Sequence, residues 1–312
     1  MKSQRGVALI TAIMVVALAT IAATALLAHS HASLRRSANL FESEAAWWYA
    51  DGLESLGRSI LKLDAEQSQT DHLGEAWAVG VPPLPVEQGV LIGEIADLHG
   101  RFNINLLALP QRQPYLEQFR RLLGDCLDQD PFLAEQLVNA IADWVDADDQ
   151  QSFPGGAEEL DYLGMDPPYR IPDRPVHSVS ELAAVKGMTR EIYQALRPHV
   201  AALPVDQGPT TINPNTATEP VLCSIPTGGQ PGPGLQAFIE EREANPLPDT
   251  QDAVTRNLFG AGFDPATITV SSEYFLLQAQ AFIGTGRVAL YSVVRRRSGT
   301  SPVTLSRRVD TD

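Results

Sequence analysis

An uncharged apolar run near the amino terminus constrains this chain more than any other feature. From Val7 to Ala28 the sequence VALITAIMVVALATIAATALLA contains no charged residue. The run is longer than the roughly 18 residues that indicate a membrane-spanning helix, and at about 1.5 Å per residue it crosses a hydrocarbon core of about 30 Å. A secretory signal peptide has a shorter apolar region followed by a small-residue cleavage site. We therefore predict a spanning helix over 7–28.

Apolar residues continue at helical spacing after this run. They recur every three or four positions, at Leu34, Ala38, Phe41, Ala45, Trp48, Gly52, Leu56, Ile60 and Leu63. No proline occurs before Pro82, so nothing forces the helix to end. We predict one continuous helix of about 55 residues and about 80 Å. Half of it lies in lipid, and the other half packs on a soluble domain through the amphipathic face.

Strand patterns lie on both sides of a long helical middle. The stretch VLIGEIADLHGRFNINLL (90–107) predicts one or two strands broken at Gly100, and SSEYFLLQAQAFI, GRVALYSVVRRR and PVTLSRRV predict three more. A helical block between strands of one sheet indicates an insertion into an α+β domain. The predicted divisions are the spanning segment 7–28, the helix and first strands 29–109, an all-α insertion 110–268, and the C-terminal strands 269–312.

Two pieces of the insertion share a pattern of capped helix, glycine turn and second helix. They are SVSELAAVKGMTREIYQALRPHV and NTATEPVLCSIPTGGQPGPGLQAFIEERE, with Ser178 or Ser180 and Asn215 or Thr216 as predicted N-caps. Helix-hairpin-helix (SAM-like) units of this kind raise a membrane-anchored DNA-binding or DNA-uptake protein as an alternative function. The formal net charge of −15 opposes it, because phosphate binding requires a concentrated positive surface. We interpret the units as packing elements and expect no nucleic-acid partner.

The middle of the chain contains a dense acidic segment. Twelve acids and no lysine or arginine lie between Leu122 and Tyr169, with ADWVDADDQQSFPGGAEELDYLG as the centre of the segment. Carboxylates crowded in this way raise each other's pKa, and Ca²⁺, which takes six to eight oxygen ligands, removes the repulsion. The segment is not an EF-hand, because Gln151 and Ala157 occupy the positions of the required Gly and Glu. A solvated acidic loop without metal is the alternative.

No catalytic pattern accompanies these features. The histidines are scattered, and the sequence lacks the HExxH zinc pattern, the GxSxG nucleophile elbow, the P-loop and the dinucleotide glycine fingerprint. We therefore predict that the protein is not an enzyme. Its cysteines, Cys126 and Cys223, either pair in an oxidising compartment or remain buried thiols.

Three features together resemble one known family. The basic leader MKSQRG precedes VALITAIMVVAL, and the acidic stretch DWVDADDQQSFPGGAEELDYLG is followed by PPYRIPDRPVHSVSELAAVKGM. Over nearly its whole length the chain resembles the K-type minor pseudopilin of bacterial type II secretion, the GspK family. The resemblance implies that residues 1–6 are a prepilin leader, that prepilin peptidase cuts after Gly6, and that the new amino terminus at Val7 is methylated.

The resemblance also implies a fold, a ligand set and partners. The fold is pilin-like, with the long helix on a small antiparallel sheet and a large helical insertion that binds calcium. Carried onto this sequence, the ligand pool is Asp143, Asp146, Asp148, Glu158 and Glu159. The implied partners are the I-type and J-type minor pseudopilins (GspI and GspJ) and the inner-membrane secretion platform, with the C-terminal domain in the periplasm.

Thr11 is informative within this resemblance. Pilin-like subunits carry Glu at the fifth mature position, where its carboxylate neutralises the terminal amine of a neighbour in the apolar filament core; an unpaired charge there is very costly. The K-type family departs from this rule, as does Thr11. A subunit without the carboxylate cannot supply this ion pair to a subunit above it, although its own Val7 amine can pair with one below, which favours the tip position. A type IV pilus minor pilin is the closest alternative.

Overall fold

The computed structural model describes residues 4–80, 82–226, 232–261, 263–297 and 299–309, so the first three residues of the predicted leader lie outside it. The α-helices are α1 (Gln4–Gln67), α2 (Gln113–Arg121), α3 (Pro131–Val145), α4 (Glu159–Leu163), α5 (Arg190–Leu196), α6 (Glu219–Ser224), α7 (Leu235–Glu241) and α8 (Thr250–Thr255). The strands are β1 (Leu84–Val86), β2 (Gly89–Asp97), β3 (Phe102–Asn103), β4 (Val200–Ala201), β5 (Tyr274–Ile283), β6 (Gly286–Arg295) and β7 (Val303–Val309). Short 3₁₀-helices are η1 (Ile104–Ala108), η3 (Val179–Ala184), η4 (Arg197–His199) and η5 (Pro265–Thr267), and η2 (Leu122–Cys126) is a short π-helix.

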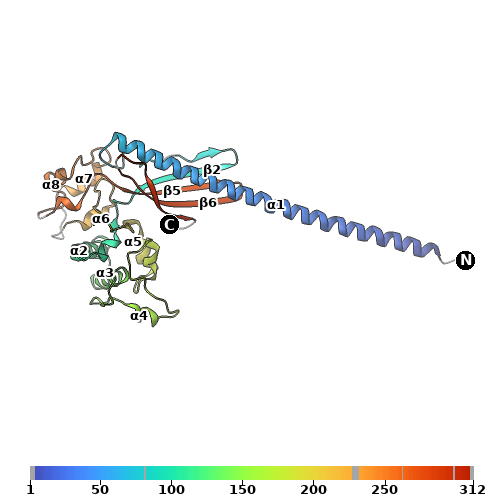
Figure 1. Ribbon diagram of the computed structural model, residues 1–312, viewed down its shortest axis with the longest axis horizontal. Coiled ribbons are helices and arrows are strands. Elements are labelled where there is room, and N and C mark those ends of the chain that lie inside the picture. Colours follow the sequence, from blue (N-terminus) through green and yellow to red (C-terminus); the bar gives the residue numbers. More distant parts are fainter. Residues whose placement is uncertain (1–3, 81, 227–231, 262, 298, 310–312) are drawn as a thin grey trace.

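The long helix is confirmed as one unbroken element. α1 extends from Gln4 to Gln67, and its amino-terminal half projects far beyond the rest of the molecule (Figure 1). Within the described residues, α1 is the single helix that is long and apolar enough to cross a membrane. The side chains of the spanning segment contact no other part of the described chain, as a lipid-facing surface requires.

The face by which α1 packs is rotated from the predicted one, although Leu56 and Ile60 of the predicted stripe still lie at the edge of the contact with the sheet. Ala46, Ala50 and Gly57 are buried against the sheet, whereas Phe41 and Trp48 are 71% and 64% exposed. Small side chains let the helix approach closely; a Cβ on Gly57 would lie 3.2 Å from the Leu277 side chain. The periodicity identified an apolar face correctly, but α1 has two such faces, and spacing cannot tell which of them meets the sheet.

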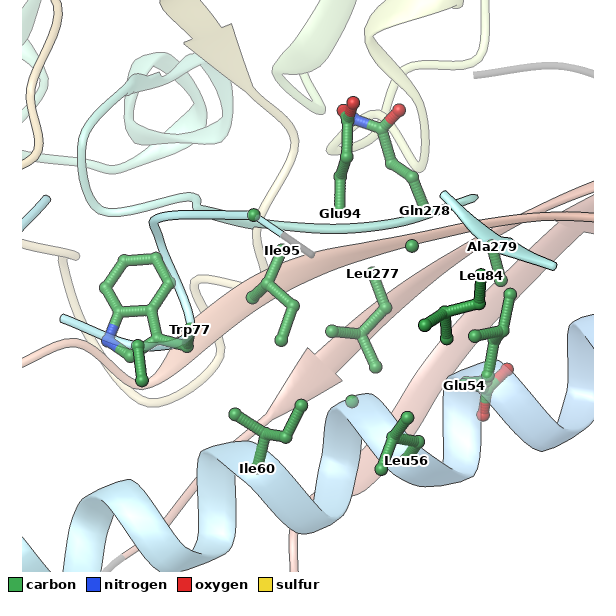
Figure 2. A pocket seen from close by; sticks show the side chains of 15 residues that line it. Glu54, Leu56, Ile60, Trp77, Leu84, Glu94, Ile95, Leu277, Gln278 and Ala279 are labelled. Atoms are coloured by element: carbon green, nitrogen blue, oxygen red, sulfur yellow. The ribbon is translucent and has the colours of Figure 1, made fainter. Parts of the chain in front are cut away.

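The sheet carries α1 on one face (Figure 1). Its order is β1-β2-β5-β6-β7, and every neighbouring pair is antiparallel. The three predicted C-terminal strands are confirmed as β5, β6 and β7. In Figure 2, Leu56 and Ile60 of α1 point toward Leu277 of β5 across a small apolar pocket, while Glu94 and Gln278 extend from the other face of the sheet.

The insertion leaves and re-enters the sheet at one end of two adjacent strands. Asp97 at the end of β2 lies opposite Phe275 at the start of β5, so the ladder closes without the residues between them. The inserted part therefore starts at residue 98 rather than 110. Phe102, Ile104 and Leu107 belong to its core. It gathers around the end of the sheet that is farthest from the amino terminus (Figure 1).

The insertion is mostly helical but not all-α. The two-residue strands β3 and β4 pair in parallel within it. Ser178 caps η3 as predicted, whereas α6 begins after Thr218, and neither Asn215 nor Thr216 is its N-cap. The Asn215 amide instead bonds the backbone of Leu247 in both directions, at 2.8 and 3.1 Å. The helix-hairpin-helix interpretation stays a prediction, since part of the second unit, 227–231, lies outside the described residues.

A buried polar network joins α1, the sheet and the insertion. Asp71, just after α1, binds Arg296 at 2.5 and 2.7 Å, and Arg296 also binds Asp64 of α1 at 2.7 Å. Burial and the neighbouring acids raise the pKa of Asp64 to about 6. On the insertion side, the carboxylate of Asp97 accepts from Ser272 and Thr216, both at 2.6 Å. Ser272 connects the α1 side of the network to the insertion side, because its backbone amide donates to Asp71 and its hydroxyl donates to Asp97.

Replacing Arg296 tests this network. Arg296→Met should lower the free energy of unfolding of the full-length protein in detergent by about 3–5 kcal/mol, because the substitution leaves the carboxylate of Asp71 buried without its cation. The matched control is Arg297→Met, which removes an exposed neighbour and should change the free energy by about 0.5 kcal/mol or less. Urea unfolding followed by tryptophan fluorescence measures both. Equal losses in the two variants would contradict the role given to Arg296.

Candidate functional site

The acidic segment is fixed in place by the end of α3. This helix begins at Pro131 after Asp130, whose carboxylate accepts from the amides of Phe132 and Leu133 at 3.0 Å. The fully buried Asp143 lies on the last turn of α3, and Asp146 follows as the C-cap. The chain then turns through 147–157 and returns at Glu158, just before α4.

Asp143 organises the loop. Its carboxylate accepts the Ser152 amide at 3.0 and 3.2 Å, and the Asn139 amide donates to the Pro154 carbonyl at 2.8 Å. Gly156 packs so tightly that a Cβ there would lie 2.2 Å from Asp143 Oδ2, so only glycine fits. Asp143 therefore uses its oxygens to hold the loop backbone in place.

Three of the five predicted ligands converge. Carboxylate oxygens of Asp146, Asp148 and Glu158 lie within 4.8 Å of one another. Asp143 is not one of this group, and neither is Glu159, which pairs with Arg170 at 3.3 Å. Asp161, which was not a predicted ligand, binds Lys186 at 2.6 Å.

Two of the three converging carboxylates, those of Asp146 and Glu158, have buried oxygens without the partners that buried carboxylates require. Both side-chain oxygens of Glu158 and Oδ1 of Asp146 are buried and make no hydrogen bond within the described chain. Burial, together with the charges of Asp143 and Asp146, raises the pKa of Glu158 to about 7. Burial also raises the pKa of Asp146, although its other oxygen binds Arg112. Unpaired buried acceptors and repelling carboxylates are what a hard cation satisfies.

Asp173 is an additional acid that sequence reasoning did not assign to the site. Its Oδ1 is buried without a partner, its backbone has a φ of 47°, and its charge contributes to the raised pKa of Glu158. Burial raises its own pKa, with contributions from Asp149 and Glu159. Asp173 follows α4 and lies outside the run of acids, so spacing gave no signal for it. The one indication was its place in the PPYRIPDRP stretch.

A second group of acids has its charge neutralised by an arginine of the protein itself. Oxygens of Asp64, Asp71 and Glu75 also lie within 4.8 Å of one another, but Arg296 binds two of the three acids there. In the loop, Arg112 reaches Asp146, and Glu158 has no such cation in the described chain. The residues of the loop therefore fit a bound divalent cation, whereas the Asp64 group is satisfied by the protein itself.

The two cysteines come together in the same domain. Cys126, at the end of η2, and Cys223, in α6, form a disulfide with a Cα–Cα distance of 6.0 Å. The disulfide links the segment that precedes α3 to α6. In the chain, α6 follows Thr216, whose hydroxyl donates to Asp97 at the base of the insertion.

A helix long and apolar enough to anchor in a membrane, packed on a five-stranded antiparallel sheet with a helical insertion, is the architecture of an anchored pilin-like protein. The family model for type II secretion system protein K matches residues 100–205, which include the acidic loop. Type II secretion system protein K of Pseudomonas aeruginosa is 34% identical, covering 95% of this chain and 90% of its own; that of Aeromonas hydrophila is 31% identical, covering 98% and 97%.

A solved structure agrees with the sequence relatives. A chain in the crystal structure of the GspK-GspI-GspJ complex from enterotoxigenic Escherichia coli superposes with a TM-score of 0.78, at 25% identity, over 89% of this chain and 100% of that chain. The chain therefore belongs to the type II secretion protein K family, the K-type minor pseudopilins, and the predicted resemblance is confirmed. It is a structural component of the secretion machinery, and its apolar amino-terminal helix fits a single-pass membrane anchor.

Proposed function

We propose that this minor pseudopilin occupies the tip of the type II secretion pseudopilus and initiates its assembly for export of folded proteins. Thr11 carries the proposal. Its neutral side chain offers no charge to a neighbouring subunit, and its hydroxyl donates to the Ala8 carbonyl of its own helix at 3.0 Å. A subunit above would bring an amino-terminal amine with no carboxylate to pair with it, whereas the amine of Val7 can still pair with a subunit below.

The insertion supports the same position. It spreads sideways from the end of the sheet that is farthest from the membrane-spanning half of α1 (Figure 1). A subunit stacked above would have to occupy this volume. The spanning helix continues into the folded domain without a break, which keeps the domain close to the membrane surface. Lys2 and Arg5 favour a cytoplasmic leader and hence a domain in the periplasm before assembly on the inner-membrane platform.

The exposed apolar face of α1 supports partners of the same class. Phe41, Trp48 and Leu63 are more than half exposed on one side of the helix, opposite the side on the sheet. Large contiguous apolar surfaces mark interaction sites, and aromatic anchors dominate such contacts. Because a structural relative was solved as a GspK-GspI-GspJ complex, we propose that I-type and J-type minor pseudopilins cover this face.

Substitutions on this face test the proposed partnership. The double variant Phe41→Ser/Trp48→Ser should reduce copurification with coexpressed I-type and J-type subunits at least ten-fold, because it removes two aromatic anchors without touching the buried face. The control is Phe132→Ser, which removes a 61% exposed aromatic from the insertion and should leave copurification unchanged. Unchanged binding by the double variant would contradict the assignment of this face.

Calcium is the cation that we propose for the acidic loop. Asp146, Asp148 and Glu158 supply converging carboxylates, Asp173 supplies a further unpaired oxygen, and Asp143 holds the loop in shape. Ca²⁺ accepts six to eight oxygens in irregular geometry, whereas Mg²⁺ keeps several waters and a strict octahedron. The bound ion would neutralise the repulsion and stabilise the insertion; the geometry gives it no catalytic task.

Calcium removal should measurably destabilise the protein. At about 100 times its dissociation constant, Ca²⁺ should add about 2.7 kcal/mol and raise the melting temperature of the full-length protein in detergent by about 5–8 °C over the chelated protein. Glu158→Gln should remove most of this shift, and its chelated form should melt no lower than the chelated wild type, because a buried charge has been removed. Glu159→Gln is the control and should keep the shift, since Glu159 pairs with Arg170 instead. Equal melting-temperature shifts in Glu158→Gln and Glu159→Gln would contradict the role of Glu158 as a ligand. No shift of the wild type at millimolar Ca²⁺ would show that the acidic loop is solvated and binds no calcium.

Cleavage of the amino-terminal leader is the subject of the remaining prediction. We propose cleavage after Gly6 by prepilin peptidase and methylation of the new amine, from the RGVALI leader. Mass spectrometry of the membrane-extracted protein should show a chain that begins at N-methylated Val7. A chain that keeps Met1 in cells containing the peptidase would refute the proposal.

A further inference from the structure

Two adjacent arginines of α1, just beyond the spanning segment, have no role in the proposed filament contacts or in the calcium loop. After the spanning segment 7–28, the first charged residues are Arg35 and Arg36, and no acid occurs before Glu42. Both arginines are exposed, and neither makes a hydrogen bond or ion pair within the described chain. The helix first bonds the folded domain at Asn39 and Glu42, which contact Thr285. The arginines therefore lie on a bare stretch between lipid and domain.

Helix geometry places their charges at the membrane surface. Taking Ala28 as the last residue in hydrocarbon, the Cα atoms of Arg35 and Arg36 lie about 10 to 12 Å beyond it. Side chains on a helix lean toward its amino terminus, here toward the membrane, and an extended arginine reaches back by about 6 Å. The guanidinium groups thus arrive about 4 to 6 Å outside the hydrocarbon. This is the depth of the headgroups, which add about 5 to 7 Å to each side of the core.

The local surface suits a phosphate group. Ala28 and Ala32 leave a shallow groove beside Arg35, Arg36 and His31, so a headgroup can approach the guanidinium groups without obstruction. Guanidinium binds phosphate oxygens in bidentate geometry. Elsewhere in the described chain most arginines have acidic or carbonyl partners, for example Arg296 and Arg242, which makes two adjacent unpaired arginines in a chain of net charge −15 unusual.

We propose that Arg35 and Arg36 bind the phosphates of anionic phospholipids while α1 is embedded in the membrane, and thereby set the depth of the helix. The alternative occupant is a carboxylate on a neighbouring subunit. The geometry favours lipid, because the side chains point back toward the spanning segment and lie outside the part of α1 that packs on the domain. Assembly must break these contacts when the helix leaves the bilayer, so they hold the unassembled subunit in place.

Lipid binding by the full-length protein tests the proposal. Detergent-solubilised protein is titrated with phosphatidylglycerol or phosphatidylcholine, and retained lipid is counted by native mass spectrometry. Wild type should prefer phosphatidylglycerol, and Arg35→Gln/Arg36→Gln should bind it about 25-fold more weakly, at about five-fold per arginine. Arg35→Lys/Arg36→Lys should retain most binding.

The control is Lys62→Gln, which removes an exposed cation from the same helix far outside the membrane and should bind phosphatidylglycerol like wild type. Wild type that binds both lipids equally would overturn the proposal, since only the apolar span would then be recognised. The proposal would also fail if the double glutamine variant kept full phosphatidylglycerol binding. Loss of copurification with I-type and J-type subunits in that same variant would then assign the arginines to a protein partner.

Discussion

Close packing of small residues on α1 against the sheet is the contact on which the rest of this structure depends. Ala46, Ala50 and Gly57 bring the helix onto β5 and β6, and this approach turns the large side chains of Phe41 and Trp48 outward. The same rotation fixes which side of the rod other subunits can reach. A helix that is already half covered by its own sheet offers one apolar face to the filament, and that face continues from the membrane-spanning segment.

The buried network at the base of the insertion then makes one body of two unlike domains. Arg296, directly after β6, binds Asp64 near the end of α1. The hydroxyl of Ser272 donates to Asp97 at the point where the insertion leaves and re-enters the sheet. Because β2 and β5 are neighbours, the sheet tolerates the inserted residues without losing its ladder. The insertion can therefore carry its own disulfide and its own acidic loop, while its position relative to the long helix is held by hydrogen bonds to buried charges.

Sequence periodicity was sufficient for the elements and insufficient for their relative rotation. The long helix, the C-terminal strands and the insertion were predictable, because apolar spacing and the absence of proline report directly on local structure. The rotation of α1 on the sheet was predicted only in part, since Ala and Gly carry little weight in an apolar pattern although they decide how closely backbones approach. In the loop, three of the predicted ligands, Asp146, Asp148 and Glu158, lie close together. Glu159 instead turns toward Arg170, and Asp143 bonds the backbone of the loop. Asp173 was not predicted, because the fold around α4 brings it near the acidic loop, whereas its position along the chain does not indicate this.

The proposed tip position rests on the absence of a charge at Thr11 and on the volume of the insertion, and both argue against a subunit above this one. Counting copies per filament tests this most directly. Immunogold labelling of isolated pseudopili, with an antibody against the insertion, should show label at one end of each filament and none along the shaft. Label repeated at regular intervals along the shaft would contradict the tip assignment.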